Sequence, residues 1–241
     1  MHALVRAFSA LNPLVVLCAI FCAEKASGDG APLMPVEEIA DIVDQFVLIE
    51  VPEPSGDGAA VPAQEFYIGR TEVTQALYHR ITGFNPSYSP CETCPVNNVS
   101  GYNIDAFIRK LNRATGLQFY LPTRREWDYA AKGGKYSRGY LYSGSNDLGE
   151  VAWYSGNSGG KIHPVAQKKP NELGLNDMTG NVSELCSDVM AGSKGSNSLF
   201  ALRGGSYDYA ESESVLSYED GISKNLRLPD VGFRLALKKD N

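Results

Sequence analysis

The hydrophobic positions of the chain fall into short runs, and the spacing within each run predicts the elements of secondary structure. Runs of β-branched and aromatic residues at 46–51 and 65–69 predict two strands, with a loop of Gly, Pro and Ala between them. A third extended piece is predicted at 119–122, where a proline follows three apolar residues. The first half of the chain is therefore expected to contain several short strands.

Three helices are predicted among these strands from apolar residues that recur at helical spacing. The first opens at 71–75, where the Thr71 hydroxyl can cap the first turn. The second spans about 104–113, and its apolar residues fall on one face. The third begins after Thr123, which can cap it, and ends at the glycine pair 133–134.

Beyond residue 134 the helical period disappears, and short apolar pieces alternate with Gly, Asn, Ser and Asp. Gly (24) and Pro (13) are abundant in the 241 residues, which also favours loops. No segment repeats at a period of about 20 to 50 residues. We therefore expect a single α+β domain with two to three helices, short strands and long loops.

The N-terminal segment has the pattern of an export signal: a basic residue, an apolar run at 14–22 and a small-residue exit. The run is too short to span a bilayer, and a buried N-terminal strand is the alternative. We expect a signal peptide at 1–26, a linker at 27–42 and the folded domain at 43–241. Cys22 closes the apolar run as the acylated cysteine of a bacterial lipoprotein does, so a membrane tether remains open. The protein is thus expected to be exported, to the periplasm or the cell surface.

The charge balance argues against one class of partner. Asp and Glu (28) outnumber Lys and Arg (22), which gives a formal net charge of −6 at pH 7. A protein that follows the phosphates of a nucleic acid usually carries the opposite sign. We therefore expect no nucleic-acid partner.

The cysteines outside the signal segment are few and are not arranged as a zinc site. Cys91 and Cys94 form a lone C-x-x-C in a proline-rich loop, and zinc would need a second pair of ligands. We favour a disulfide that clamps this loop, with two free thiols as the alternative. Cys186 is then unpaired, and we interpret it as a small buried hydrophobic residue.

A family resemblance rests on seven motifs spread from about residue 46 to residue 237. They are YIGRTEVTQALY (67–78), NPSY (85–88), CPVNNVS (94–100), LPTRREWDYAAKGG (121–134), VAWYSGNSGGKIHPVAQKKPNELGLNDMTGNVSEL (151–185), LRGGSY (202–207) and VGFRLAL (231–237). The chain resembles the formylglycine-generating-enzyme (sulfatase-modifying factor) domain family, which implies a variant of the C-type lectin fold. We interpret Arg203 and Arg234, in the last two motifs, as bidentate structural clamps.

The same resemblance implies a structural calcium ion in the loop 177–184. Side-chain oxygens would come from Asp177 and Glu184, and backbone carbonyls from Gly180 and Val182. Calcium prefers such a cage of oxygen atoms. Two carboxylates across one turn repel each other unless a cation lies between them, and an Arg or Lys side chain is the alternative cation.

Enzymes of this family use a cysteine pair, shortly after the GGSY-type motif, to bind copper and oxidise a target cysteine. The matching positions here are Tyr209 and Ser214, and no cysteine follows Cys186. Neither side chain replaces a thiolate. We therefore expect no formylglycine-generating activity and no copper. Related members build an iron site from histidines, but His79 and His163 are isolated in the sequence.

The segment 207–227, called here the recognition segment, has the Tyr-, Ser- and Asn-rich composition of a contact surface. We expect a protein or other macromolecular ligand to bind there through Tyr207, Asp208, Tyr209, Ser212, Ser214, Tyr218, Asp220, Asn225 and Arg227.

The chain also resembles the variable proteins of diversity-generating retroelements, including exported ones of spirochaetes. These proteins place their variable residues between RGGS and GFRL motifs, which here bracket the recognition segment. The alternatives are a binder of fixed specificity, a scaffold in a surface assembly, a formylglycine-generating oxidoreductase, or a solvated loop that contacts nothing in particular.

Overall fold

The computed structural model describes residues 33–52, 62–190 and 198–239. The expected signal peptide at 1–26 and the possible acylation site at Cys22 lie outside these residues. Within the described part of the chain, no helix is long and apolar enough to cross a membrane.

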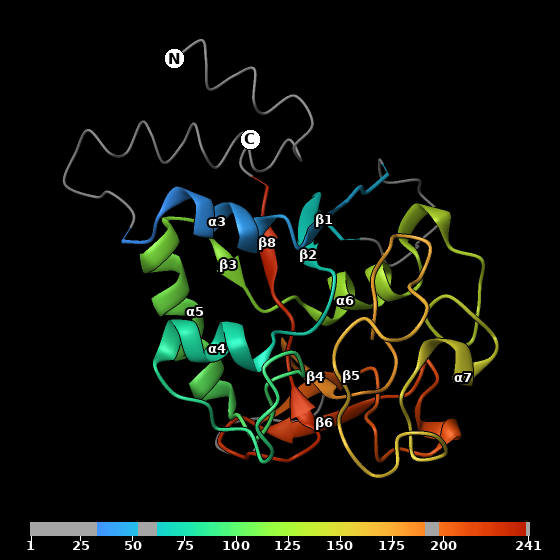
Figure 1. The fold of residues 1–241 in the computed structure, drawn as a ribbon. Helices are drawn as coiled ribbons and strands as arrows, with labels where there is room; N and C mark the ends of the chain where they lie inside the picture. The colour runs from blue at the N-terminus through green and yellow to red at the C-terminus, as the bar shows by residue number, and fades with distance from the viewer. Residues whose placement is uncertain (1–32, 53–61, 191–197, 240–241) are drawn as a thin grey trace.

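Two small sheets lie at opposite ends of the domain (Figure 1). The first is antiparallel and has the order β1–β2–β8–β3, made by Phe46–Ile49, Phe66–Gly69, Ala236–Lys238 and Phe119–Tyr120. The second has the order β6–β5–β4–β7, made by Asp220–Ser223, Leu199–Arg203, Ser183–Val189 and Val231–Gly232. Its β4–β7 pair is parallel and its other pairs are antiparallel. Of the two C-terminal strands, β7 thus belongs to the second sheet and β8 to the first.

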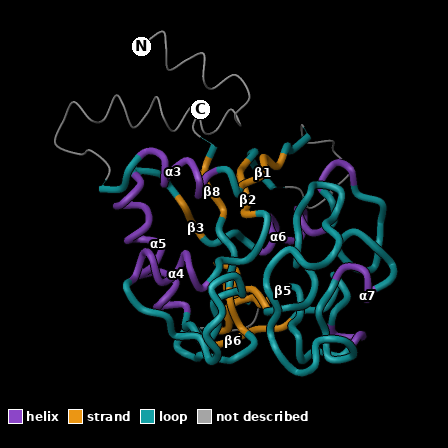
Figure 2. The backbone as a smooth tube through the Cα atoms, in the orientation of Figure 1, coloured by secondary structure: helices purple, strands orange, loops and turns teal. Residues whose placement is uncertain are grey.

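The described residues form five α-helices, more than the two to three predicted from the sequence. They are α3 (Val36–Val43), α4 (Gln75–Thr82), α5 (Gly101–Thr115), α6 (Arg124–Ala131) and α7 (Leu148–Val151), and short 3-10 turns cover Gly134–Tyr136 and Glu211–Glu213. Helices α4 and α5 lie on one side of the domain, and loops form most of the side around α7 (Figure 2). The α+β class and the loop-rich second half are confirmed.

The start of α4 differs from the prediction. Thr74, not Thr71, caps the helix, and its hydroxyl accepts a hydrogen bond from the Leu77 amide at 3.2 Å. The preceding backbone is extended because Val73 bonds in both directions, donating to the Phe233 carbonyl and accepting from the Val96 amide. The predicted third helix is confirmed, because Thr123 caps α6 in a reciprocal capping box with Glu126.

Helix α3 overlaps the range 27–42 that the sequence led us to assign to a linker. Ile39, Ile42 and Val43 are buried in it, and they pack in the same core cluster as Phe46 and Phe119. The spacing of these three apolar residues is helical, but a helix of only about two turns after Pro35 is too short to stand out in the sequence. The folded domain therefore begins before residue 43.

The main core fills the space between α3, α4, α5 and the two sheets. Its centre is aromatic: Tyr78 stacks on Phe107 at 5.1 Å, and Phe107 meets Phe233 edge-on at 5.5 Å. A second cluster surrounds Trp127, which is fully buried on α6. These two cores hold the strands from which the loops of the candidate site emerge.

Substitution at Ile39 tests whether α3 belongs to the domain. Ile39→Ala is expected to lower the free energy of unfolding by about 2–5 kcal/mol, because a fully buried side chain is removed. The matched control Val36→Ala, in the same helix but exposed, is expected to change it by less than about 0.5 kcal/mol. Urea unfolding of both variants measures the change in the free energy of unfolding. Equally small changes in the two variants would show that α3 belongs to the linker and not to the folded domain.

Candidate functional site

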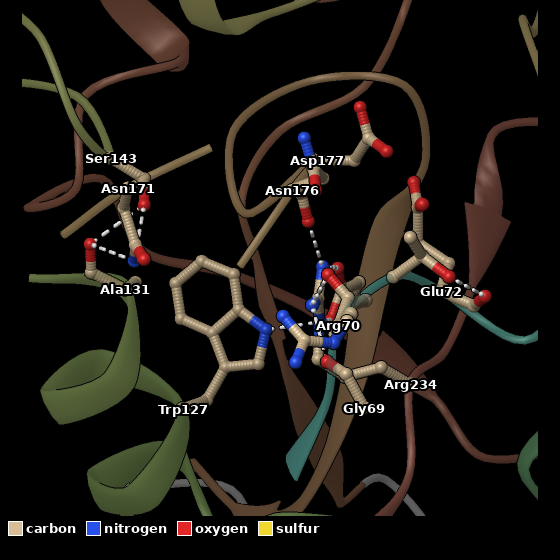
Figure 3. A network of polar contacts seen from close by, with 12 residues as sticks. Gly69, Arg70, Glu72, Trp127, Ala131, Ser143, Asn171, Asn176, Asp177 and Arg234 are labelled. Atoms are coloured by element: carbon tan, nitrogen blue, oxygen red, sulfur yellow. Dashed lines mark hydrogen bonds and ion pairs between the residues drawn. The ribbon is translucent and has the colours of Figure 1, made fainter. Parts of the chain in front are cut away.

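An ion pair with no access to solvent lies between the two sheets. Arg234, in the link between β7 and β8, is 0% exposed, and Glu184 on β4 is 1% exposed. The guanidinium Nε and Nη2 atoms donate to the two carboxylate oxygens of Glu184, each at 2.6 Å. The Trp127 indole Nε1 donates to the same carboxylate at 2.6 Å (Figure 3). The Glu184 carboxylate therefore accepts from three donor groups, which belong to two buried side chains.

The remaining donors of Arg234 bind backbone carbonyls from other segments. Nη1 donates to the Gly69 carbonyl at the end of β2, and Nη2 donates to the Asn176 carbonyl, each at 3.0 Å. Arg234 thus connects both sheets with the loop before β4, which confirms its interpretation as a structural clamp.

The two carboxylates expected to bind calcium have protein partners in the structure. Glu184 faces Arg234, so the alternative in which an arginine supplies the cation applies to this carboxylate. Asp177 is also buried, but its Oδ2 accepts a hydrogen bond from the Ala166 amide at 2.7 Å, and its Oδ1 has no partner among the described residues. In the part of the chain that the structure describes, no group of three or more His, Cys, Asp or Glu side chains is placed to hold a metal. Calcium binding by the set of Asp177, Gly180, Val182 and Glu184 stays a prediction, with Glu184 held by Arg234 and Asp177 by the Ala166 amide in the structure.

A second buried arginine fixes the recognition segment. Arg203, at the end of β5, is 4% exposed and binds Asp128 of α6 through Nε at 2.7 Å and Nη2 at 2.6 Å. Its remaining N–H groups donate to the carbonyls of Leu216, at 2.6 Å, and Tyr218. Arg203 is thus also a clamp, and it holds the backbone of the recognition segment against the core.

The predicted contact residues differ in how far they reach solvent. The exposed ones are Asp208, Ser212, Asn225 and Arg227, and the partly buried ones are Tyr207, Tyr209, Tyr218 and Asp220. Ser214 is buried, at 1% exposed, and its hydroxyl is satisfied within the segment by donating to the Ala210 carbonyl at 3.0 Å. Its assignment to the contact surface was therefore wrong.

Two of the partly buried tyrosines bind within the segment itself. The Tyr209 hydroxyl donates to the Asp220 carboxylate, and the Tyr209 ring meets the Tyr218 ring edge-on at 6.1 Å. Burial, and then this hydrogen bond, raise the pKa of Tyr209 above its usual range. These contacts fold the segment into a defined shape, so its exposed side chains keep fixed positions.

Tyr207 lines a cavity of about 450 Å³. Its wall includes Tyr88, Lys161 and His163 from loops distant in the sequence, and the Cys91–Cys94 pair borders it. The two cysteines form a disulfide, which agrees with the predicted loop clamp. The wall combines aromatic, cationic and hydrogen-bonding groups, the composition of a small recognition pocket.

The sequence did not single out the wall residues of this cavity as a site. Tyr88 is 73% exposed although it lies in the NPSY motif, and an exposed aromatic residue within a rigid loop is the signal that could have identified it. His163 stacks on Trp153 at 3.7 Å and its Nε2 lies 2.7 Å from the Ser158 carbonyl. Nothing in the sequence relates these positions to Tyr207, because the pairing arises from loop packing.

Comparison with known proteins gives four similarities. A family model described as the sulfatase-modifying factor enzyme 1-like domain matches residues 52–239. Among solved structures, Treponema denticola variable protein 1 is 30% identical, covers 80% of this chain and 95% of its own, and superposes with a TM-score of 0.69. A protein named CarF is 26% identical, with 81% and 98% covered and a TM-score of 0.68. A protein of Paenibacillus barcinonensis named chaperone protein LppX is 29% identical over 254 residues, which cover 82% of this chain and 91% of that protein.

Removal of the buried arginine tests how much the domain depends on it. Arg234→Met is expected to lower the free energy of unfolding by about 3–5 kcal/mol, because Glu184 is left buried without its cation. The control Arg124→Met, whose partner Glu219 is exposed, is expected to cost less than about 1 kcal/mol.

A second variant separates the charge from the packing. The double change Arg234→Met/Glu184→Gln is expected to recover part of the loss, because the neutral amide still accepts from Trp127 and no unpaired charge remains. Equilibrium denaturation of all variants provides the measurement, and an effect of Arg234→Met no larger than that of Arg124→Met would refute the assignment.

Proposed function

The chain belongs to the sulfatase-modifying factor enzyme 1-like family, as a single C-type-lectin-like α+β domain, and we propose that it is a non-catalytic binding protein. The observation that carries the proposal is the support of the recognition segment. Arg203 anchors its backbone at two carbonyls, while several of its polar side chains remain exposed. A rigid frame that presents variable polar loops is an arrangement suited to recognition.

The contact surface extends from the recognition segment into the adjoining cavity. Tyr207 lies at the junction, and the exposed Tyr88 forms another part of the cavity wall. Aromatic residues provide much of the binding energy at protein interfaces, and exposed polar residues complete the rim. The relative named a chaperone supports a protein as the ligand.

The chemistry of the segment supports binding over catalysis. The positions that match the family's cysteine pair are Tyr209, whose hydroxyl binds Asp220, and Ser214, whose hydroxyl binds the backbone. Cys186 is the free cysteine of the described residues, and burial raises the pKa of its thiol, which disfavours the reactive thiolate. Conversion of the cysteine in a sulfatase-type peptide to formylglycine by the purified protein would contradict this proposal.

The site of action is proposed to be outside the cytoplasm, in the periplasm or on the cell surface. The N-terminal apolar run supports export, and Cys22 would provide a membrane tether if it is acylated. The Cys91–Cys94 disulfide supports the same assignment, because such bonds persist in oxidising compartments.

Binding to a defined array of purified extracellular proteins tests the surface, with a glycan array as the second arm. We expect a specific ligand whose affinity falls at least about tenfold in Tyr207→Ala, since a central aromatic side chain is removed. The matched control Tyr136→Ala removes an exposed tyrosine outside the proposed surface and is expected to change nothing. Equal losses in both variants, or no ligand on either array, would count against this function.

Genetic diversification of the recognition segment is proposed as well, and the relative named a variable protein supports it. Sequencing the 3′ end of the gene and its downstream flank in several isolates is expected to reveal a near-copy of the codons for 203–234 that differs at adenines. Variation is expected at exposed Asp208, Ser212 and Asn225 and not at buried Ser214, because the fold constrains Ser214. An invariant segment without a near-copy would leave a binder of fixed specificity.

A further inference from the structure

The loops that line the cavity at Tyr207 are joined to each other by buried hydrogen bonds. Ser158, 1% exposed, donates from its hydroxyl to the Tyr207 carbonyl at 2.8 Å. Asn181, 0% exposed, accepts from the His163 amide at 3.0 Å through Oδ1, and its own carbonyl accepts from the Tyr207 amide at 2.9 Å. The loop 158–163 therefore keeps a fixed position against the start of the recognition segment.

A further buried amide joins the other two segments of the cavity wall. Asn97, 3% exposed, accepts from the Tyr88 amide at 3.2 Å and donates to the Pro229 carbonyl. The Cys91–Cys94 disulfide borders the cavity in the same loop as Tyr88. The cavity of about 450 Å³ is thus preformed, and its volume lies in the range of about 300–1,000 Å³ that ligand pockets occupy.

The charge of the cavity wall is opposite to that of the whole protein. The chain has a formal net charge of −6 at pH 7, yet the described residues that line the cavity include Lys161 and no Asp or Glu. Lys161 is exposed, and no carboxylate of the described residues forms an ion pair with its ammonium group. The cavity therefore offers a cation that is free to pair with a ligand.

His163, the other basic residue of the wall, is already engaged within the protein. Its ring stacks on Trp153 at 3.7 Å, and its Nε2 lies 2.7 Å from the Ser158 carbonyl. Because a carbonyl only accepts hydrogen bonds, Nε2 is the protonated nitrogen of this ring. His163 thus shapes the wall, and Lys161 is the group that can attract an anion.

We propose that this cavity binds the carboxylate of an acidic residue in a protein ligand, with Lys161 as its cation. The inference rests on the proposed binding function and adds the chemistry of the ligand at this site. Tyr88, Tyr207 and Pro229 provide rings against which the neighbouring apolar part of the ligand can pack. A charge pair at such a pocket fixes the orientation and specificity of the ligand.

Two aspartates restrict where the carboxylate can lie. Asp208 and Asp230 do not line the cavity, but after burial their charges are the next causes that raise the pKa of Tyr207. The Tyr207 hydroxyl therefore keeps its proton, and the two aspartates would repel a carboxylate placed beside it. We expect the ligand's carboxylate beside Lys161, and an uncharged acceptor such as a peptide carbonyl beside Tyr207.

A peptide array of matched sets tests this chemistry. Each set uses one scaffold of uncharged residues, acetylated and amidated at its ends, with Glu, Gln or Lys at its centre. Among the scaffolds that bind the labelled protein, we expect the Glu peptide to bind at least about tenfold more tightly than the Gln peptide, and the Lys peptide to bind most weakly. A fourth peptide, with Gln at the centre and a free C-terminal carboxylate, distinguishes a chain terminus from an acidic side chain as the source of the carboxylate.

Variants at one exposed position assign the preference to Lys161. Lys161→Met is expected to remove the difference between the Glu and Gln peptides. Lys161→Glu is expected to reverse the preference, so that the Lys peptide binds best, and a merely structural role of Lys161 would not produce this reversal. Lys132→Met removes an exposed lysine outside the cavity wall, and it is the matched control that should retain the preference for Glu.

Titration with a Glu peptide from the array locates the site. We expect the backbone amide NMR signals of Gly160, Lys161 and Ile162, which line the cavity, to shift as the peptide binds. Signals that shift only at other residues would place the peptide elsewhere and overturn the inference.

Two results on the array would also overturn it. One is the absence of a preference for Glu over Gln, whether the peptides bind equally or not at all. The other is a preference for Glu that survives Lys161→Met. Neither result removes the proposed binding function, because the loss of a protein or glycan ligand in Tyr207→Ala tests that function separately.

Discussion

The ion pair between Arg234 and Glu184 is the interaction on which the arrangement of the domain depends. One guanidinium reaches a carboxylate on β4, a carbonyl at the end of β2 and a carbonyl in the loop before β4, so it joins the two sheets at a single point. Trp127 adds a donor from α6 and shields the pair from water. A buried charge tolerates little displacement, because each lost contact leaves an unsatisfied group. This requirement orients the elements from which the contact loops emerge.

Arg203 has the same chemistry and a different task. It binds Asp128 of α6 and two carbonyls of the recognition segment, so the segment is attached to the core through its backbone. Attachment through carbonyls is independent of side-chain identity. The side chains of Asp208, Ser212 and Asn225 can therefore change without loss of this anchor. Stability thus depends on backbone carbonyls of the segment, and specificity on side chains at other positions in it.

Local features of the fold could be predicted from the sequence, whereas long-range pairings could not. The Thr123 cap, the Cys91–Cys94 bridge and the clamping role of the arginines follow from short spacings or from the chemistry of single side chains. The partner of Glu184 could not be predicted in this way, because Arg234 lies 50 residues away in the sequence. Ser214 was misjudged because a hydroxyl that bonds its own backbone resembles, in sequence, one that faces a ligand. Helix α3 was missed because its stability comes from packing in the core, not from its length.

The order of strands in the first sheet has a consequence for biogenesis. Strand β8 lies between β2 and β3, yet it follows every other described strand in the chain. That sheet remains open in a nascent polypeptide until β8 has been synthesised, and pairing across such a long sequence separation is slow. If the chain is exported as proposed, it can reach a secretion channel before this sheet has closed. Topology itself would then keep the polypeptide competent for translocation.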